Sequence, residues 1–352
     1  MMVSSELVTD RRQRPLQVLR LSLTARCNLA CSYCQPDHRE VSGLLSQSQR
    51  LALIEACCRL GVRSLRLTGG EPLLSDQLEP LLEAILLRRQ QPGDPLSKLK
   101  EVALTSNGLL LDQARAERLR RAGLDRITLS LDGLDAAVVA AMAGLPEVGE
   151  AGARALAAVR EAIVVAREAG FDPRLGALKL NSVIQRGRNE DQLLPLAAFA
   201  RDQGLELRLI EFMDVGHRNG WSGDQVMPAA EMLRQLQTVW PLEPLGRPVG
   251  GTARRWRYRD GAGVVAMIAS VSEPFCSDCN RARITADGQL FTCLFASTGL
   301  NLRPWLEPCN DPEVLCAVLR QHWRARTDRY SEERGLKSGL VPERAEMAYL
   351  GG

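Results

Sequence analysis

Six of the ten cysteines fall into two groups of three whose spacing suits metal binding. One group is spaced C-x3-C-x2-C and the other C-x2-C-x13-C, and the members are Cys27, Cys31 and Cys34, then Cys276, Cys279 and Cys293. Structural zinc takes four protein ligands, and each group supplies three. A cubane iron–sulfur cluster held by three thiolates leaves one iron open to a small molecule. The first group directly follows a predicted strand, and this position favours a catalytic cluster there.

Zinc remains the alternative, because a fourth ligand is available in principle for each group. His38 is the candidate for the first group, and Cys309 or Cys316 for the second. Disulfides are not expected in a chain predicted to be cytoplasmic. Cys309 and Cys316, together with Cys57 and Cys58, lie in apolar or helix-like contexts and are predicted to be small buried hydrophobic residues.

Short strand-like runs alternate with amphipathic stretches over the first two thirds of the chain. The predicted strands cover 16–24, 63–69, 101–107, 125–132, 174–184 and 205–213, and the predicted helices include 46–60, 112–122, 151–169 and 190–203. Repeated βα units predict a parallel sheet. The fold class is therefore α/β, and six units indicate an incomplete (β/α)6 TIM-type barrel, with a doubly wound sheet as the alternative.

The composition changes after Trp221, where a stretch rich in Pro, Gly and Arg precedes two hairpin-like pieces. This change predicts three parts of the chain: an N-terminal extension (1–15), a partial barrel (16–222) and a smaller C-terminal region (223–352).

Alternation along the predicted strands separates polar from apolar side chains. Arg20, Arg66, Ser130 and Lys179 each lie on the face opposite neighbouring leucines or isoleucines. A solvated sheet face would show the same pattern, but parallel sheets are usually covered on both faces. Because active sites of βα barrels lie at the carboxyl ends of the strands, the polar face is predicted to line a site.

Two further motifs point to ligands. Gly69 and Gly70, followed by Glu71, end the second predicted strand, and glycines there allow the backbone to approach a ligand closely. Arg281 and Arg283 alternate between the cysteines of the second group, so both guanidinium groups face one side, which suits a phosphate group.

The bulk composition excludes several classes of protein. No apolar run approaches the roughly 18 residues of a membrane helix, and the N-terminus has no apolar core of a secretory signal. The net charge of +3 is too small to indicate nucleic-acid binding by itself. We therefore expect a cytoplasmic protein without membrane or nucleic-acid partners.

The motifs together resemble those of a known family. C-x3-C-x-Y-C after the first strand, with GGEP after the second, is similar to the signature of the radical S-adenosylmethionine (SAM) superfamily. The stretches LRLSLTARCNLACSYC, LIEFMDVG, SVSEPFCSDCNRARITADGQLFTCLF and the terminal MAYLGG resemble the molybdenum cofactor biosynthesis protein A family, the GTP 3′,8-cyclases. The chain departs from the usual family pattern at Ala25 and Ser106.

The resemblance implies cofactors and site residues. It implies two [4Fe–4S] clusters, one on each cysteine group, with SAM on the first and the guanine of GTP on the second. Contacts to SAM are expected from Tyr33, Gly69, Gly70, Glu71, Ser130 and Met213. Contacts to GTP are expected from Arg20, Arg66, Thr105, Lys179, Arg281, Ala282 and Arg283. The residues expected to be catalytic are Arg20, Lys179, Arg281, Arg283, Gly351 and Gly352.

The implied reaction is the first step of molybdenum cofactor biosynthesis. A 5′-deoxyadenosyl radical takes the hydrogen from ribose C3′ of GTP, and C3′ then bonds to C8 of guanine. The expected partners are an external electron donor and the next enzyme of the pathway, cyclic pyranopterin monophosphate synthase. The oligomeric state is left open, a homodimer included.

Two other functions are considered. A radical SAM enzyme with an auxiliary cluster could act on a peptide or on another nucleotide. A zinc-stabilised RNA-binding protein could use its Arg-rich segment, 320–334, on phosphates, although Asp328, Glu332 and Glu333 weaken that segment as a phosphate-binding strip.

Overall fold

One mixed sheet runs through the computed structural model of the chain, which describes residues 7–36, 39–146, 149–307, 311–334 and 344–352. Its central strands are all parallel: β1 (Val18–Ser22), β2 (Ser64–Thr68), β3 (Glu101–Ser106), β4 (Arg126–Ser130), β5 (Leu178–Ile184) and β6 (Glu206–Glu211). They pair in chain order, and the sheet does not close on itself in the described residues. The predicted incomplete barrel is confirmed.

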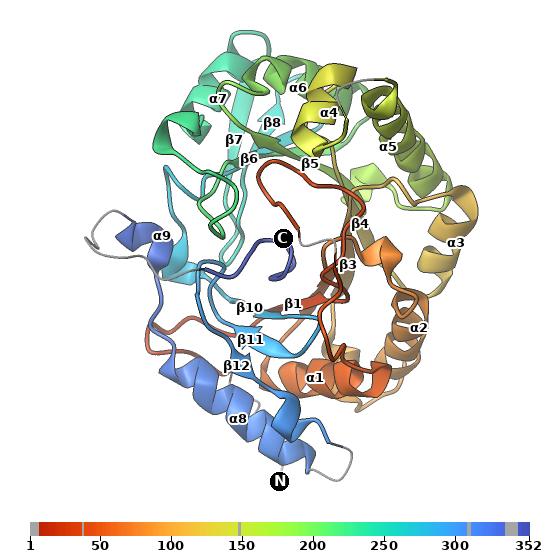
Figure 1. Cartoon of the computed structure of the whole chain (residues 1–352), viewed down its shortest axis with the longest axis vertical. Helices are drawn as coiled ribbons and strands as arrows, with labels where there is room; N and C mark the ends of the chain where they lie inside the picture. Colours follow the sequence, from red (N-terminus) through yellow and green to blue (C-terminus); the bar gives the residue numbers. More distant parts are fainter. Residues whose placement is uncertain (1–6, 37–38, 147–148, 308–310, 335–343) are drawn as a thin grey trace.

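Helices follow each of these strands on the outside of the curved sheet (Figure 1). They are α1 (Gln47–Leu60), α2 (Leu78–Arg89), α3 (Gln113–Arg121), α4 (Ala136–Ala143), α5 (Ala151–Glu168), α6 (Leu193–Asp202) and α7 (Ala229–Gln237). Local sequence sets the ends of α1. The Ser46 hydroxyl accepts from the Gln49 amide at 3.2 Å, the Gln49 side chain accepts from the Ser46 amide at 3.0 Å, and Gly61 ends the helix at φ 125°.

The two faces of the sheet differ as alternation predicted. Leu19, Leu21, Leu65 and Leu67 are fully buried in the main core between strands and helices. The opposite face carries arginine, threonine, serine and asparagine side chains toward the inside of the barrel. Because the helices cover the apolar face, the polar face is free to line a ligand cavity.

The C-terminal region extends the same sheet at both edges. At β6 it adds β9 (Val264–Ile268), β8 (Arg254–Tyr258) and β7 (Leu242–Gly246), and at β1 it adds β10 (Arg281–Ile284), β11 (Gln289–Phe291) and β12 (Leu300–Asn301). Then α8 (Pro312–Ala325) packs on α1, and the short α9 (Tyr330–Glu333) follows. The C-terminus returns to the centre of the barrel in Figure 1.

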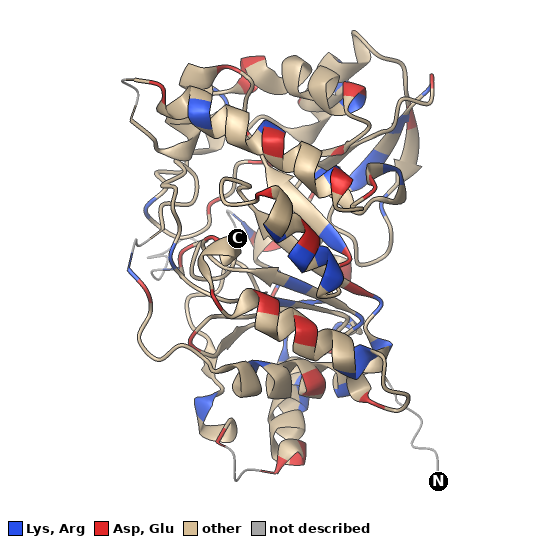
Figure 2. Ribbon diagram, turned by 90° about the vertical axis from the view of Figure 1, so that its right-hand side faces the viewer, with Lys and Arg blue, Asp and Glu red and all other residues tan. Residues whose placement is uncertain are grey.

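Three of the four cysteines outside the two groups are buried, as predicted. Cys57 and Cys58 on α1 and Cys316 on α8 all belong to the main core. Cys309 and His38 lie outside the described residues. Figure 2 shows basic and acidic residues interspersed along the outer helices of the side that it presents. In the described ranges, no helix is both long and apolar enough to cross a bilayer.

Candidate active site

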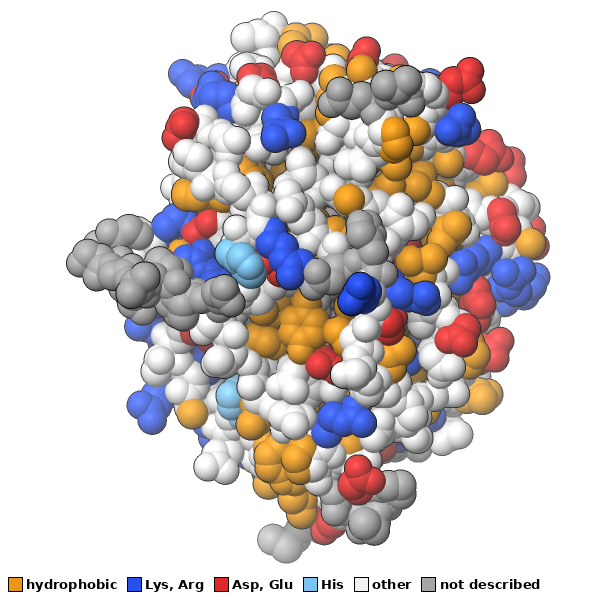
Figure 3. Space-filling view, viewed as in Figure 1, with side chains coloured by type: hydrophobic (Ala, Val, Ile, Leu, Met, Phe, Trp, Pro, Cys, Tyr) orange, Lys and Arg blue, Asp and Glu red, His pale blue; other side chains and the backbone are white. Residues whose placement is uncertain are grey.

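A single cavity inside the barrel is lined by both cysteine groups. Side chains of β1–β6, β9 and β10 form its wall, and all six predicted ligand cysteines border it. On the face viewed in Figure 1, hydrophobic side chains gather near the centre, with Lys, Arg and His side chains around them (Figure 3). All six thiols are free, and within the described ranges no three His, Cys, Asp or Glu side chains converge as ligands of one ion.

The loop carrying the first cysteine group packs on the glycines that follow β2. A Cβ atom on Gly70 would lie 2.2 Å from the Arg26 carbonyl oxygen, and one on Gly69 would lie 2.6 Å from that of Thr24. The Gly70 amide donates to the Thr24 carbonyl oxygen at 2.8 Å. Both glycines therefore serve a close approach between two loops, and this approach places Cys27 at the carboxyl end of the strands.

Glu71 is buried and bonded within the protein. Its carboxylate accepts from the Leu73 amide at 2.9 Å, the Ser106 hydroxyl at 2.8 Å and the Asn107 amide at 2.8 Å. Burial raises the pKa of Glu71 despite these bonds. This carboxylate ties the loop after β2 to the end of β3, and Ser106 supplies one of the donors.

The other residues predicted to contact SAM lie around the first cysteine group. Tyr33, Gly70, Ser130 and Met213 all border the cavity. The Tyr33 hydroxyl donates to Asp132 at 2.8 Å, and burial is the main reason that the pKa of Asp132 rises to about 6.

The second cysteine group lies at the opposite end of the strands. β10 runs parallel to β1, with Val18 opposite Arg281 and Arg20 opposite Arg283, so Cys279 sits just before the amino end of this pair. Cys27 follows the carboxyl end of β1. The five residues of β1 alone span roughly 13 Å. The strands between the two groups therefore form the wall along which a substrate can extend.

The three thiols of the second group differ in their surroundings. Burial raises the pKa of Cys293 to about 12 and also raises that of Cys276. Burial acts in the same direction on Cys279, but Arg281 and Arg326 outweigh it and lower the pKa to about 7.

Three arginines on neighbouring strands line the cavity between the two groups. Buried nitrogen atoms without a hydrogen-bond partner in the described structure occur on each of them: Nε of Arg20, Nε of Arg66 and Nη1 of Arg283. Burial and then the charges of neighbouring arginines lower the pKa of Arg66 to about 9 and that of Arg283 to about 10. Three neighbouring cations, each with a buried nitrogen atom that lacks a partner, are costly alone and suit a polyanion.

Carboxylates neutralise the cations at the amino ends of the strands. Glu206 accepts from Lys179 at 3.1 Å, from Arg208 at 2.8 Å and from Arg255 at 3.0 Å. Burial raises the pKa of Glu206, but these cations outweigh it and lower the pKa to about 2. Lys179 therefore lies on the predicted face but is bonded to Glu206, and burial lowers its own pKa to about 8.

The C-terminal tail enters the cavity. Arg20 Nη2 donates to the Gly351 carbonyl oxygen at 2.9 Å and also to that of Gly352, and the Thr68 hydroxyl donates to Gly351 at 3.0 Å. Asp214, which follows β6, anchors the approach of the tail. It accepts from Arg334 at 2.7 Å and from Arg344 at 2.9 Å.

The remaining predicted contacts divide between cavity and core. Thr105 and Arg281 line the cavity, and Arg281 Nη1 donates to the Gly250 carbonyl oxygen at 3.0 Å. The Ala282 side chain lies in the main core on the opposite face of β10. Its predicted role as a substrate contact remains a prediction.

Our sequence reasoning missed several side chains of the cavity. Arg126 and Arg208 face it from β4 and β6, and Arg326 reaches it from beyond α8. Strand alternation carried the signal for Arg126, which shares a face with Thr128 and Ser130. No comparable signal marked Arg326, because its position depends on how α8 packs.

The Arg-rich segment proposed for RNA binding is largely paired within the fold. Arg326 is bonded to Asp328 at 2.9 Å, Arg329 to Glu332 at 2.8 Å and Arg334 to Asp214. These cations are therefore engaged with acids of the same chain, which argues against the RNA-binding alternative.

Comparisons with known proteins identify the family of the chain. The model of the radical SAM superfamily matches residues 21–200, and that of the family "Molybdenum Cofactor Synthesis C" matches residues 205–332. A GTP 3′,8-cyclase of Parasynechococcus marenigrum is 61% identical over 351 residues, 100% of both chains. One of Xanthomonas axonopodis pv. citri is 43% identical, with 97% of this chain and 98% of the relative covered.

Solved structures agree at the level of the fold. The crystal structure of Streptococcus suis SuiB bound to the precursor peptide SuiA has a TM-score of 0.60 at 14% identity, covering 88% of this chain and 68% of that one. The chain belongs to the radical SAM superfamily and, within it, to the family of the GTP 3′,8-cyclases. Enzymes of this superfamily bind SAM and a [4Fe–4S] cluster, and this chain is one of them.

Gly70→Ala tests whether the glycines position the first cysteine group. The added Cβ would overlap the Arg26 carbonyl oxygen, so the loop must move. We expect the affinity for SAM, measured by equilibrium dialysis on the reconstituted enzyme, to fall by tenfold or more, about 1.4 kcal/mol. Gly223→Ala is the control, because its Cβ would meet no atom nearer than 3.9 Å. An unchanged affinity in Gly70→Ala contradicts this account of the loop.

Glu206→Gln tests the neutralised end of the barrel. A depressed pKa means that the carboxylate stabilises the fold above about pH 4.5 and loses this effect as the pH falls toward 2. The Glu206 carboxylate therefore contributes on the order of 3 kcal/mol to the free energy of unfolding at pH 7. We expect the variant to be less stable at pH 7 by roughly 3 kcal/mol or more, with a flatter loss of stability below pH 4.5. Urea unfolding at several pH values measures this, and Glu243→Gln, at an exposed position, is the control. If the free energy of unfolding of Glu206→Gln changes with pH in parallel with that of the parent, the account is wrong.

Proposed function

We propose that this chain is a GTP 3′,8-cyclase, which converts GTP to (8S)-3′,8-cyclo-7,8-dihydroguanosine 5′-triphosphate at the start of molybdenum cofactor biosynthesis. The observation that carries the proposal is a group of three arginines between the two cysteine groups in one cavity, each with a buried nitrogen atom that has no hydrogen-bond partner in the described residues. A nucleoside triphosphate brings about four negative charges, which this group of cations suits. The names of the full-length relatives support the same reaction.

The residues present fit two clusters. Each cysteine group offers three free thiols that border the cavity, and three thiolates leave an iron open to a small molecule. In this proposal Cys27, Cys31 and Cys34 hold the cluster that binds SAM. Cys276, Cys279 and Cys293 hold a second cluster, beside which the guanine binds. When bound, and with an external electron donor, the first cluster and SAM would supply the radical chemistry that takes the hydrogen from C3′ of the ribose.

The protein itself positions the nucleotide and excludes competing reactants. Arg20, Arg66 and Arg283 bind the triphosphate and hold the nucleotide along the strands. Tyr33, Ser130 and Met213 border the SAM end of the cavity, so the ribose lies between the two ends. The tail lines the cavity with Met347 and Gly352, and in this proposal it helps to keep water and other hydrogen donors away from C3′ until C3′ bonds to C8.

Gly351 and Gly352 complete the substrate end in this proposal. Their carbonyl oxygens accept from Arg20, so the tail orients a guanidinium that also faces the triphosphate. Lys179 joins the triphosphate contacts when the substrate competes with Glu206 for its ammonium group. Ala282 contributes through its backbone, because its side chain lies in the core.

The wider assignment follows the same proposal. The partial barrel of 16–222 supplies the SAM end, and the region 223–352 supplies the second cluster and the tail. The external partners are an electron donor and cyclic pyranopterin monophosphate synthase, which takes the product. A homodimer is compatible with this assignment.

Incubation of the anaerobic enzyme with GTP, SAM and a reductant tests the reaction. We expect 5′-deoxyadenosine and the cyclic nucleotide in equal amounts, from protein that contains roughly eight irons if both clusters are cubanes. Zinc in place of iron, or 5′-deoxyadenosine without loss of GTP, rejects the proposal. If 5′-deoxyadenosine forms without loss of GTP, consumption of an added peptide or of another nucleotide would identify the alternative radical SAM activity.

Cys293→Ser tests the second cysteine group. We expect the iron content to fall by about half and GTP turnover to fall at least 100-fold, because one cluster loses a ligand. Uncoupled cleavage of SAM should persist, since the first group is intact. Cys316→Ser, which changes a thiol in the core, is the control. Cyclisation of GTP by Cys293→Ser at the parent rate shows that the second group is not catalytic.

A further inference from the structure

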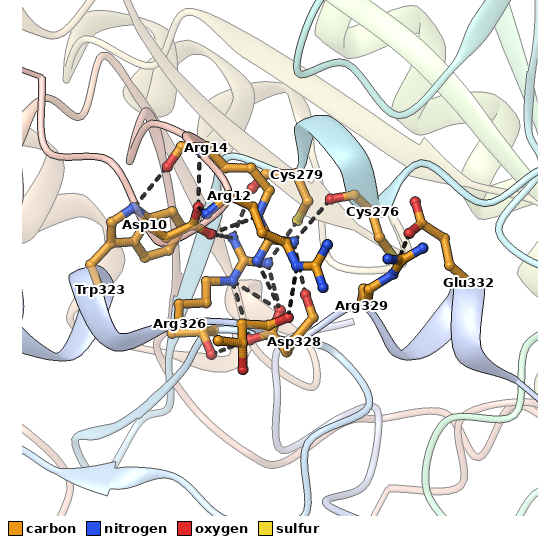
Figure 4. Close-up of polar contacts among 12 residues, drawn as sticks. Asp10, Arg12, Arg14, Cys276, Cys279, Trp323, Arg326, Asp328, Arg329 and Glu332 are labelled. Carbon is orange, nitrogen blue, oxygen red and sulfur yellow. Dashed lines mark hydrogen bonds and ion pairs between the residues drawn. The ribbon is translucent and has the colours of Figure 1, made fainter. Parts of the chain in front are cut away.

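Arg326 approaches a sulfur atom of the second cysteine group. Its Nη2 lies 3.3 Å from Cys279 Sγ, and its Nη1 donates to the Cys279 carbonyl oxygen at 2.7 Å (Figure 4). The guanidinium therefore contacts both the backbone and the side chain of one predicted ligand. A charged donor to sulfur is among the stronger hydrogen bonds that a protein provides.

The guanidinium is held in place by its surroundings. Arg326 is only 5% exposed, and its guanidinium lies over the Trp323 ring at 4.7 Å. Asp328 accepts from Nε at 2.9 Å and pairs with Nη2 at 2.9 Å. Asp10 lies 3.8 Å from Nη1. Two acids and a ring thus leave Arg326 with one orientation, which points at Cys279.

Arg14 occupies the same buried network without contacting a sulfur atom. It is bonded to Asp10 at 2.6 Å, and its Nη1 donates to the Cys276 carbonyl oxygen at 2.9 Å. In Figure 4 the two arginines lie side by side, one directed at a sulfur and the other at a carbonyl oxygen. Arg14 is therefore a matched control for Arg326, because it is also a buried cation but does not donate to a sulfur atom.

The first cysteine group has no comparable contact in the described structure. Cys27 Sγ accepts from the Leu29 amide at 3.5 Å and lies 3.9 Å from the Asn107 side-chain nitrogen, and both donors are neutral. Among the hydrogen bonds of the described residues, a cation donates only to the sulfur of Cys279. The two ends of the cavity are therefore electrostatically different.

We propose that Arg326 is a positioning residue that holds Cys279 as a cluster ligand and raises the reduction potential of the second cluster. The proposal rests on the second cluster of the proposed function. Adding an electron makes a cluster more negative, and a cationic donor to a ligand sulfur stabilises that extra charge. The second cluster then accepts electrons more readily than it would with neutral donors alone.

The test isolates the second cluster in the full chain. Cys27, Cys31 and Cys34 are changed to serine together, and the potential of the remaining cluster is measured by redox titration followed by electron paramagnetic resonance. In this background, Arg326→Gln should lower the reduction potential of the cluster. At a fixed applied potential, the ratio of reduced to oxidised cluster should fall on the order of tenfold, which corresponds to about 59 mV for one electron. Arg14→Gln, the control for loss of a buried cation that does not donate to sulfur, should lower the potential by less than Arg326→Gln does.

The outcomes separate this proposal from the proposed function. An unchanged potential in Arg326→Gln overturns the role of Arg326, whether or not the intact enzyme cyclises GTP. No iron in the parent triple variant overturns both the second cluster and the role of Arg326. Loss of iron from folded Arg326→Gln, with iron retained in Arg14→Gln, supports the positioning of Cys279. If Arg326→Gln does not fold, Arg326→Met is measured instead, because it removes the charge but keeps an apolar stem; a lower potential supports the proposal, and an unchanged one overturns it.

Discussion

The site depends on positive charge that the protein itself leaves unneutralised. Glu101 and Glu206 pair with the cations at the amino ends of β3–β6. Arg66 and Arg283 have no Asp or Glu partner in the described structure, and Arg20 donates to Gly351 and Gly352 of the tail. Burial lowers the pKa of all three arginines. Like charges held together in a low-dielectric cavity repel one another, and a polyanion relieves this repulsion. The cavity is therefore most stable when a ligand of the right charge occupies it.

Strand register is what forces these charges together. In the parallel ladder, Arg20 lies opposite Arg66 on one side and opposite Arg283 on the other. Side chains at paired positions point to the same face, so the three arginine side chains leave the sheet side by side on the wall of the cavity. Burial of the opposite face, with Leu19 and Leu65 fully inaccessible, stabilises the strands that hold them.

The C-terminal region completes the site in two ways. β10 joins the edge of the barrel beside β1 and brings both the second cysteine group and Arg283 to the cavity. The tail then returns to Arg20, anchored by the bonds of Asp214 to Arg334 and Arg344. The same elements that extend the sheet therefore also define the end of the cavity opposite the first cysteine group.

Much of this arrangement was determined by the sequence alone, because alternation, cysteine spacing and glycine placement are local properties. They identified the strands, the polar face with Arg20 and Arg66, and the cysteines that border the cavity. Tertiary structure alone decided which charges are paired. Lys179 looked free in its strand until β6 placed Glu206 against it, and Arg326 reached Cys279 only through the packing of α8. Such partners lie tens of residues apart, and no local pattern encodes which buried charge will meet which.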